Sequence, residues 1–427
     1  MFIVDGQNNP NNAPGAQPES PADPALAGHL VPYLQAILHP RNTSLPLLEC
    51  PFPDTIRYEY LQAGTNEDNS NELKYLFALD LRQCIGVLPR LLGSIIEAIK
   101  FLGPASCALS IVEGNSDDGT YEVLRALRPE MDELGVAYFL QSSTIDPAAG
   151  ERIRKLAQLR NMALLPLVAP SEMPPSTTAL PRHLPAASAN TSVIFLNDVA
   201  PCVTDILELV HQRYFQSAHM TCAMDWTYVG QDPTFYDVWV ARTLRGDLFF
   251  DIPPDGNWNS AWNLFWNDAT TRDRFHKMLP FQVYACWNGI AVFGAGPVLG
   301  LPANSESSRS GRVGFRAPRE GECYGGEPTL FCKDLWWAGY GRIAVVPSVN
   351  LEYSDEAAKK IKDLKGYSSR WAAAEDEEAS RIQWVDEPPE STFLARGQDM
   401  SKIPESGKDK SERSKTISRR YSHQTLR

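Results

Sequence analysis

The chain has little positive charge and no cysteine spacing of the kind that binds zinc. Lys and Arg number 40 against 52 Asp and Glu, which gives a net charge of −12. Proteins that hold nucleic acid over a broad surface neutralise phosphates with Lys and Arg, so this balance argues against that class. The eight cysteines contain no CxxC pair and the seven histidines no HExxH motif, so no zinc site of either type is expected.

A long uninterrupted hydrophobic run is also missing. The most apolar stretch, 283–302, contains four glycines and two prolines, which would leave backbone groups unpaired in lipid. Residues 1–4 are followed at once by polar residues and proline, so no N-terminal signal or membrane anchor is recognised. We therefore expect a globular chain in which 283–302 is buried strand and loop.

The first half of the chain alternates between strand and helix patterns. Strands are predicted at 73–81, 107–112, 136–140 and 193–196, and helices at 87–101, 120–127, 152–165 and 205–214. This alternation predicts a doubly wound α/β layer with parallel strands. After residue 214 the pattern is irregular and rich in aromatic residues, with one further strand predicted at 341–349.

Composition divides the chain into three parts. Residues 1–56 are mostly rich in Pro, Ala and Asn and are predicted to be largely disordered. Residues 57–365 are predicted to form one folded domain. Residues 366–427 carry an acidic block and then a basic block, which is typical of a solvated tail.

Polar residues follow two of the predicted strands directly. Residues 113–120 read Glu-Gly-Asn-Ser-Asp-Asp-Gly-Thr, so Glu113, Asn115 and Asp117 would place side-chain oxygens at the carboxyl end of a strand, where nucleotides bind. The alternative is a purely structural role, because Ser116 or Asp117 would also suit the N-cap of the next helix.

Asn197 and Asp198 end the second such strand. A carboxylate there can hold Mg²⁺ or Mn²⁺ against a diphosphate, and the metal would stabilise charge on the leaving nucleotide. An Asp that caps the turn before residues 199–201 is the alternative. Between the two strand ends, Arg160 and Asn161 lie on a predicted helix, where the guanidinium suits a diphosphate unless it is a surface arginine.

Aromatic residues beside polar ones mark a second set of candidates. The pairs Asp225-Trp226 and Trp287-Asn288 follow apolar strands and are predicted to bind a sugar acceptor. Three further tryptophans at 258, 262 and 266 have helical spacing, which favours core packing instead.

The cysteines and two tripeptides bear on the cellular compartment. An even number of cysteines does not distinguish disulfides from buried thiols, although Cys323 and Cys332 are close enough in sequence to close a short loop. The tripeptides that begin at Asn42 and Asn190 match the N-glycosylation acceptor pattern in predicted exposed segments. Both are compatible with a secretory lumen.

Taken together, these motifs make the chain similar to the fungal capsule-associated α-1,3-mannosyltransferase family, the cryptococcal mannosyltransferase type. The resemblance spans about 70–355. It rests on residues 112–120, 159–161, 195–199, 222–226, 235–239, 286–289, 322–323 and 342–350.

The resemblance implies a glycosyltransferase A-type fold, a Rossmann-like mixed sheet with helices on both faces and an irregular, aromatic-rich acceptor half. It implies retaining transfer of mannose from GDP-mannose to the 3-hydroxyl of a mannoside in cell-wall or capsule glycan synthesis, with Mn²⁺ or Mg²⁺. Its partners would be a sugar nucleotide and a glycan acceptor. The implied roles are nucleotide binding for Glu113, Asn115, Asp117, Arg160 and Asn161, metal binding for Asp198, acceptor binding for Trp226, Trp287 and Asn288, and carboxylate assistance for Asp225 or Asp237.

This sequence departs from the family pattern in three places. Asp198 is the single acid of its motif, so Asp334 and Glu322 are candidates for a further ligand. Family members are usually anchored in the Golgi by an N-terminal membrane helix that is not recognised here, which leaves peripheral or indirect membrane association. Residues 325–328, near Cys323, also differ from the family pattern. The alternatives are the same fold with another sugar nucleotide, and a non-catalytic glycan-binding relative.

Overall fold

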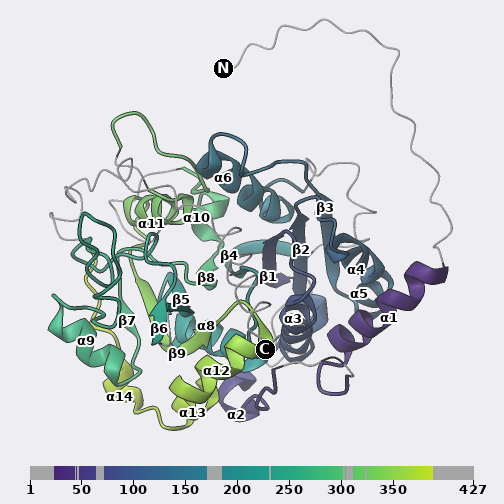
Figure 1. Cartoon of the computed structure of the whole chain (residues 1–427), viewed down its shortest axis with the longest axis horizontal. Helices are drawn as coiled ribbons and strands as arrows, with labels where there is room; N and C mark the ends of the chain where they lie inside the picture. The colour runs from purple at the N-terminus through teal and green to yellow at the C-terminus, as the bar shows by residue number, and fades with distance from the viewer. Residues whose placement is uncertain are drawn as a thin grey trace, which may run out of the picture.

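The computed structural model describes residues 24–43, 45, 48–63, 72–170, 185–229, 232–301, 303, 311–322 and 325–387. A nine-stranded mixed sheet runs through the described part in the order β3-β2-β1-β4-β8-β5-β9-β7, with β6 paired to β5 (Figure 1). The strands are β1 (Glu72–Leu81), β2 (Cys107–Glu113), β3 (Ala137–Ser142), β4 (Ala186–Leu196), β5 (Met220–Val229), β6 (Asp232–Phe235), β7 (Phe281–Gln282), β8 (Ile290–Gly294) and β9 (Ile343–Leu351).

Strands β1 to β4 pair in parallel, as the alternating pattern predicted. Strand β8 is antiparallel to both β4 and β5, so β5 runs in the same direction as β4, and β9 pairs with β5 in parallel. Six strands therefore end at one edge of the sheet, and β8 begins there. We call this edge the carboxyl edge.

Two apolar layers cover the two faces of the sheet. One packs around α1 (Pro24–Leu38), α3 (Leu88–Leu102), α4 (Thr120–Ala126), α5 (Arg128–Leu134) and α8 (Val203–Phe215). The other contains residues of α6 (Arg152–Ala163), α7 (Leu165–Val168), α10 (Gly296–Leu299), α11 (Glu327–Trp337) and α9 (Ala269–His276), together with most of the aromatic second half. Figure 1 shows α6, α10 and α11 grouped on one side of the sheet. The predicted mixed α/β sheet with helices on both faces is confirmed.

The side-chain periodicity of β1 shows why this strand can lie between the two layers. From Tyr75 on, Leu76 and Ala78 face the layer that contains α6, whereas Tyr75 and Phe77 face the layer that contains α3. Successive side chains of a strand point to opposite faces, so a strand with apolar residues in both sets is buried on both sides.

The folded part extends beyond the predicted limits 57–365. On the N-terminal side, α1 packs against α3, so 1–56 is not disordered throughout. On the C-terminal side, α12 (Asp355–Lys365) is followed by α13 (Ser368–Ala373) and α14 (Glu377–Ser380). Trp384 Nε1 then donates to Gln216 O at 2.8 Å. The predicted tail boundary at 366 is therefore too early. Residues 1–23 and 388–427 lie outside the described residues.

Two disulfides cross-link the part of the domain that the structure describes. Cys50–Cys202 ties the segment after α1 to the start of α8, and Cys222–Cys286 ties β5 to the segment before β8. Cys332 is a buried free thiol, as are Cys84 and Cys107. The pairing of Cys332 with Cys323 that the spacing allowed is therefore wrong, and Cys323 itself lies outside the described residues. Sequence spacing did not identify either real pair because each joins distant segments.

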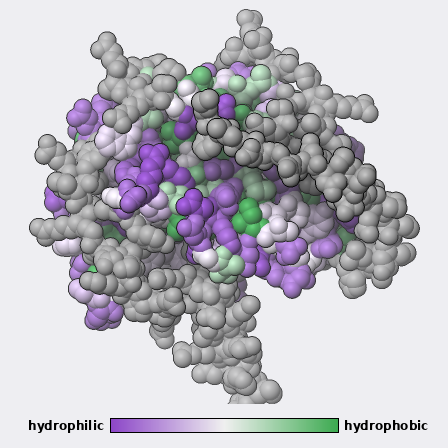
Figure 2. Space-filling model, turned by 90° about the horizontal axis from the view of Figure 1, so that it is seen from above, coloured by the Kyte–Doolittle hydropathy of each residue, from purple (hydrophilic) through white to green (hydrophobic). Residues whose placement is uncertain are grey.

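Among the helices that the structure describes, none is both long and apolar enough to cross a bilayer. The face in Figure 2 is mainly hydrophilic where it is coloured, with small hydrophobic spots between polar residues.

Candidate functional site

The segment after β2 is shaped by Glu113. This side chain is buried, and its carboxylate accepts hydrogen bonds from the backbone N–H groups of Asn115 at 3.1 Å and Ser116 at 2.7 Å. Asn115 adopts a positive φ of 57°, a conformation that Asn tolerates better than most residues. Glu113 therefore folds the turn, while Asn115 and Asp117 are the exposed polar side chains on it.

A second segment, after β1, is hydrogen-bonded to this turn. Gln83 N donates to Ser116 Oγ at 2.9 Å, and the Gln83 side chain pairs with Asp117. Helix α4 begins after Gly119 without a side-chain cap from Ser116 or Asp117, so the helix-cap alternative for these two residues is not observed. The two segments form a hydrogen-bonded polar surface at the carboxyl edge.

Arg160 is buried on α6, which rules out a surface arginine. Its Nε donates to Glu327 Oε1 at 3.0 Å, and its guanidinium carbon lies 4.5 Å from the centre of the Trp287 ring. Nη1 is buried and has no hydrogen-bond partner among the described residues. A buried donor without a partner is costly, so this nitrogen is suited to an anionic ligand.

Glu327 was missed by sequence reasoning. It is the first residue of α11 and follows Gly325 and Gly326, so the only signal was a glycine-rich entry to a helix with an acid in its first turn. Its partner Arg160 is 167 positions away in sequence, and no local pattern reveals a pairing of that range.

Asn161 is placed differently from its prediction. Its Nδ2 donates to Phe315 O at 2.8 Å and its Oδ1 accepts from Phe315 N at 3.0 Å. Both ends of the amide thus hold the segment that contains Phe315 against α6. In the described structure Asn161 positions backbone, and its amide is already engaged rather than presented to a nucleotide.

Asp198 is exposed at the carboxyl edge, directly after β4. Its neighbour Asn197 accepts from Trp287 Nε1 at 3.0 Å. The next helix, α8, begins at Val203 with Cys202 as its N-cap, so Asp198 does not cap it. The position of Asp198 remains compatible with a metal ligand.

Asp80, a further acid that sequence reasoning missed, lies near Asp198. Strand β1 pairs with β4 in parallel up to Leu79 and Leu196, which brings Asp80 beside the end of β4. Burial raises the pKa of Asp80 to about 6; Arg160 opposes this rise, and Glu327 and Asp198 add to it. The local signal was an acid near the end of a mostly apolar strand. Asp80, Asp198 and Glu327 form a locally acidic group that a cation would stabilise.

The two acids considered as further metal ligands are occupied elsewhere. Arg316 Nε donates to Asp334 Oδ2 at 2.5 Å, and Arg316 Nη1 donates to Glu322 Oε2 at 2.6 Å. Arg316 lowers the pKa of Glu322 well below its usual range, opposed by burial and helped by Lys333. These carboxylates are ion-paired with arginine, so the structure does not favour them as metal ligands.

The residues predicted at the acceptor side do come together, but as a buried network. Tyr353 OH donates to Asp225 Oδ2 at 2.6 Å, and Asp225 Oδ1 accepts from Asp237 N at 3.3 Å. Asp237 Oδ2 accepts from Asn288 N at 3.1 Å. Asp225 and Asn288 are fully buried. As placed here, the two carboxylates orient backbone, and Tyr353 belongs to the network although no local sequence pattern indicates it.

Two tryptophans that were predicted to be accessible are buried, and two that were predicted to be buried are exposed. Trp226 and Trp287 are buried, and Trp226 Nε1 donates to Asn350 Oδ1 at 2.8 Å, so neither ring presents a face to a sugar in this structure. Trp262 is 79% exposed and Trp266 is 41% exposed, so the prediction that they pack in the core is wrong. Trp258 does pack against the core. Helical spacing was misleading because residues 257–266 do not form a helix.

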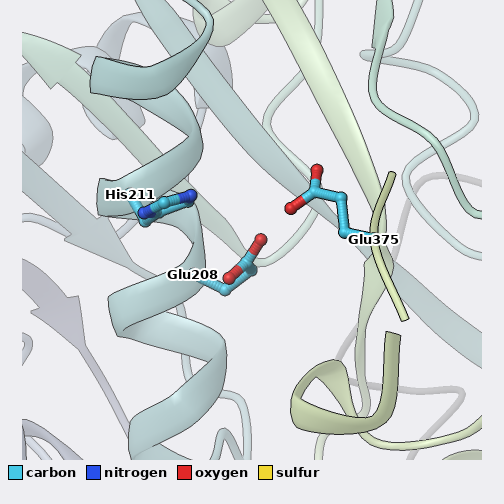
Figure 3. A group of neighbouring side chains, drawn as sticks. All are labelled: Glu208, His211 and Glu375. Carbon is cyan, nitrogen blue, oxygen red and sulfur yellow. The ribbon is translucent and has the colours of Figure 1, made fainter. Parts of the chain in front are cut away.

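Within the described ranges, one cluster of acidic and histidine side chains has its ligand atoms within 4.8 Å of one another: Glu208, His211 and Glu375 (Figure 3). Glu208 and His211 lie one turn apart on α8, and Glu375 approaches from the C-terminal segment. Arg57 donates to Glu208 Oε2 at 3.0 Å from Nε and also bonds Glu375. Both carboxylates are therefore already paired with one arginine, and the cluster does not resemble an open metal site.

Comparison with known proteins places the chain in a family. A family model described as cryptococcal mannosyltransferase 1 matches residues 74–334. An alpha-1,3-mannosyltransferase of Cryptococcus neoformans is 35% identical over 328 residues, which cover 74% of this chain and 66% of that relative. The match thus spans just under two thirds of the relative's length.

Solved structures give weaker likenesses. A mannosyltransferase from Pyrobaculum calidifontis in complex with GDP-Man and Mn²⁺ is 13% identical, with a TM-score of 0.36 over 77% of this chain and 67% of that one. The transferase GalNAc-T7 with UDP, GalNAc and Mn²⁺ is 14% identical, with a TM-score of 0.37 over 81% of this chain and 57% of that one. At these TM-scores neither likeness carries an argument about activity.

Proposed function

Because the chain belongs to the cryptococcal mannosyltransferase 1 family, we propose that it is a metal-dependent mannosyltransferase. The proposed reaction transfers mannose from GDP-mannose to the 3-hydroxyl of a mannoside with retention of configuration. The structural observation that carries the proposal is Arg160, a buried guanidinium with an unpaired Nη1 beside acidic residues at the carboxyl edge. In parallel α/β sheets this edge is where nucleotides bind.

The donor is proposed to lie across the ends of β1, β2 and β4. Asn115 and Asp117 are exposed on a turn that Glu113 and Gln83 hold in place, so they can meet ribose or base donors without rearrangement of the backbone. Arg160 would donate from Nη1 to a diphosphate oxygen, with its plane held by Glu327. A guanidinium fixed in this way needs little reorganisation as negative charge grows on the leaving group.

A divalent cation fits the residues present. Asp198 is an exposed carboxylate, and oxygen ligands of this kind suit Mn²⁺ and Mg²⁺. Asp80 and Glu327 add negative charge nearby. When bound, the cation would offset charge on the leaving nucleoside diphosphate.

For the acceptor side, we propose that the buried network positions the site. Hydrogen bonds fix the segment before β8 against the end of β5, and they link Tyr353, Asp225, Asp237 and Asn288 in that order. That segment also carries Trp287, which packs on Arg160. A role of Asp225 or Asp237 as helper carboxylate requires this segment to open when an acceptor binds.

We also propose a secretory compartment, the Golgi lumen. Two disulfides join segments 152 and 64 residues apart, and such cross-links are typical of oxidising compartments. A protein kept in the cytosol would have both pairs reduced.

The decisive experiment incubates the purified full chain with Mn²⁺ and a panel of sugar nucleotides, with and without α-mannobiose, and follows nucleoside diphosphate release. The proposal is supported if nucleoside diphosphate is released from GDP-mannose and from no other sugar nucleotide, and if Asp198→Ala abolishes this release. Asp273→Ala is the matched control, since Asp273 is an exposed acid on α9. Release from UDP-sugars would overturn the donor, and acceptor binding without any release would indicate a non-catalytic relative.

A further inference from the structure

A bulge in β4 exposes Asn190 at the edge of the sheet opposite the carboxyl edge. The register with β1 jumps from Leu73 opposite Ala187 to Tyr75 opposite Ser192, so β4 has extra residues here. The bulge has internal order, because Asn190 N donates to Ser188 Oγ at 3.1 Å. Asn190 is therefore an exposed asparagine on a defined turn.

Asn190 begins an N-glycosylation acceptor tripeptide, Asn190-Thr191-Ser192. In the folded chain the third residue is fully buried. Ser192 Oγ accepts from Arg213 Nη1 at 3.0 Å and pairs with Tyr214 OH at 3.0 Å. An enzyme that must engage this hydroxyl cannot reach it in the folded protein, so any modification of Asn190 must precede completion of the fold.

A hollow of about 200 Å³ lies next to Asn190. Its lining is aromatic and polar, with residues Tyr60, Leu61, Glu72, Lys74, Tyr75, Asn190 and Tyr214. Two of the tyrosines are substantially exposed, Tyr60 at 49% and Tyr214 at 39%. Exposed aromatic faces next to charged side chains suit a sugar ring, which has both C–H faces and hydroxyl groups.

We propose that Asn190 carries an N-linked glycan whose first N-acetylglucosamine lies in this hollow, against Tyr60 and Tyr214. The donor is a lipid-linked oligosaccharyl diphosphate. A bond forms from Asn190 Nδ2 to C1 of the N-acetylglucosamine, the C1–O bond to the lipid diphosphate breaks, and one amide proton is released. The acceptor tripeptide and the adjoining aromatic hollow are independent observations that meet at one residue.

The position separates this site from the proposed chemistry. Residues Glu72 and Lys74 line the hollow at the start of β1, whereas Asp80 lies near its end. A glycan here would leave the carboxyl edge open. The inference depends on passage through the secretory pathway and not on mannosyltransferase activity, so it can fail while the proposed function holds.

The first experiment tests attachment. The full chain is directed into the yeast secretory pathway and its mass is compared before and after treatment with peptide-N-glycosidase. We expect Asn190→Gln to lose the mass of one glycan. The matched control is Asn42→Gln, at the other tripeptide, which should keep the glycan on Asn190. A chain with no glycan, or an unchanged glycan mass in Asn190→Gln, would overturn the proposal.

The second experiment tests the hollow. For the native glycoprotein we expect Tyr60→Ala and Tyr214→Ala to speed enzymatic release of the Asn190 glycan by roughly two- to tenfold, the size of one lost aromatic contact. After denaturation all variants should release it at the same rate, which shows that the difference arises in the native protein, and urea unfolding midpoints equal to that of the wild type exclude misfolding as its cause. Equal native rates in wild type and both variants would show that the glycan does not lie in the hollow.

Discussion

Arg160 Nε donates to Glu327 Oε1 at 3.0 Å, which joins α6 to the first residue of α11 inside the protein. The Arg160 side chain is 9% exposed and that of Glu327 is 4% exposed. Because the pair uses Nε and leaves Nη1 without a described partner, it fixes the guanidinium while keeping a donor available. This is the arrangement expected of a preorganised anion site.

We expect Arg160→Ala to lower turnover by about 10²- to 10³-fold, as for loss of one preorganised donor to a transition state. It should also lower the free energy of unfolding by about 3 kcal/mol, since Glu327 would stay buried without its partner. Steady-state kinetics and urea unfolding measure the two effects. Arg154→Ala is the control, because Arg154 is an exposed arginine on the same helix. Wild-type turnover in Arg160→Ala would refute the role.

A second prediction concerns the Cys222–Cys286 disulfide, whose partners are 64 residues apart. Replacing both cysteines by serine should destabilise the fold by about 4 kcal/mol, the chain-entropy value for a loop of this length. Turnover should fall as well, because Cys286 directly precedes Trp287, the ring beside Arg160. Chemical unfolding and GDP release provide the measurements. Cys107→Ala removes a buried free thiol without a cross-link, and its smaller effect calibrates the loss of packing.

The third prediction is a pH dependence from Glu352. This side chain is buried, and burial raises its pKa from 4.5 to about 7, opposed by the Tyr353 N–H and Lys360. The folded state therefore holds a proton that the unfolded state releases at lower pH. Stability should decline as pH rises from about 4.5 to about 7, by about 3 kcal/mol at most.

Glu352→Gln should remove this decline, so the variant becomes more stable than wild type above pH 7 and matches it near pH 4. Urea unfolding midpoints from pH 4 to 8 give the comparison. If wild type and variant show parallel pH profiles, Glu352 is not the titrating group.

The fourth prediction concerns the cluster of Glu208, His211 and Glu375. Arg57→Met should destabilise the protein by about 3–5 kcal/mol, because Glu208 is 2% exposed and would lose its charge partner. Lys277→Ala, in an exposed pair on the surface, should have no measurable effect. Added Zn²⁺ should leave the melting temperature of the wild type unchanged. A rise on addition of Zn²⁺ would show that the cluster binds metal after all.

The strand-end residues could be predicted because the signal is local. An apolar run that stops at polar residues shows where a strand ends, and parallel strands end together, so the turn after β2 and Asp198 were expected at one edge. Glu113 was expected to hold the nucleoside, but in the structure it folds its own turn. A motif shows that a carboxylate is needed at a position without showing which donor it meets.

Residues without a local signal were missed or misplaced. Trp287, which was predicted to be accessible to an acceptor, is 1% exposed, whereas Trp262, which was predicted to pack in the core, is 79% exposed. Asp225 was taken as accessible, but Tyr353, 128 positions away, donates to it inside the protein. Burial depends on which distant segments cover a residue, and a single sequence does not contain that information in readable form.

By itself the sequence determined the alternation of strands and helices, the family resemblance, and the strand-end positions of Glu113 and Asp198. These follow from hydrophobic periodicity and short motifs, whose physical causes act over a few residues. Only the tertiary structure decided that Arg160 pairs with Glu327, that Asp80 joins the acidic group, and which cysteines are cross-linked. Those relationships arise when packing of the two apolar layers brings remote segments together, because burial then requires each polar group to find a partner.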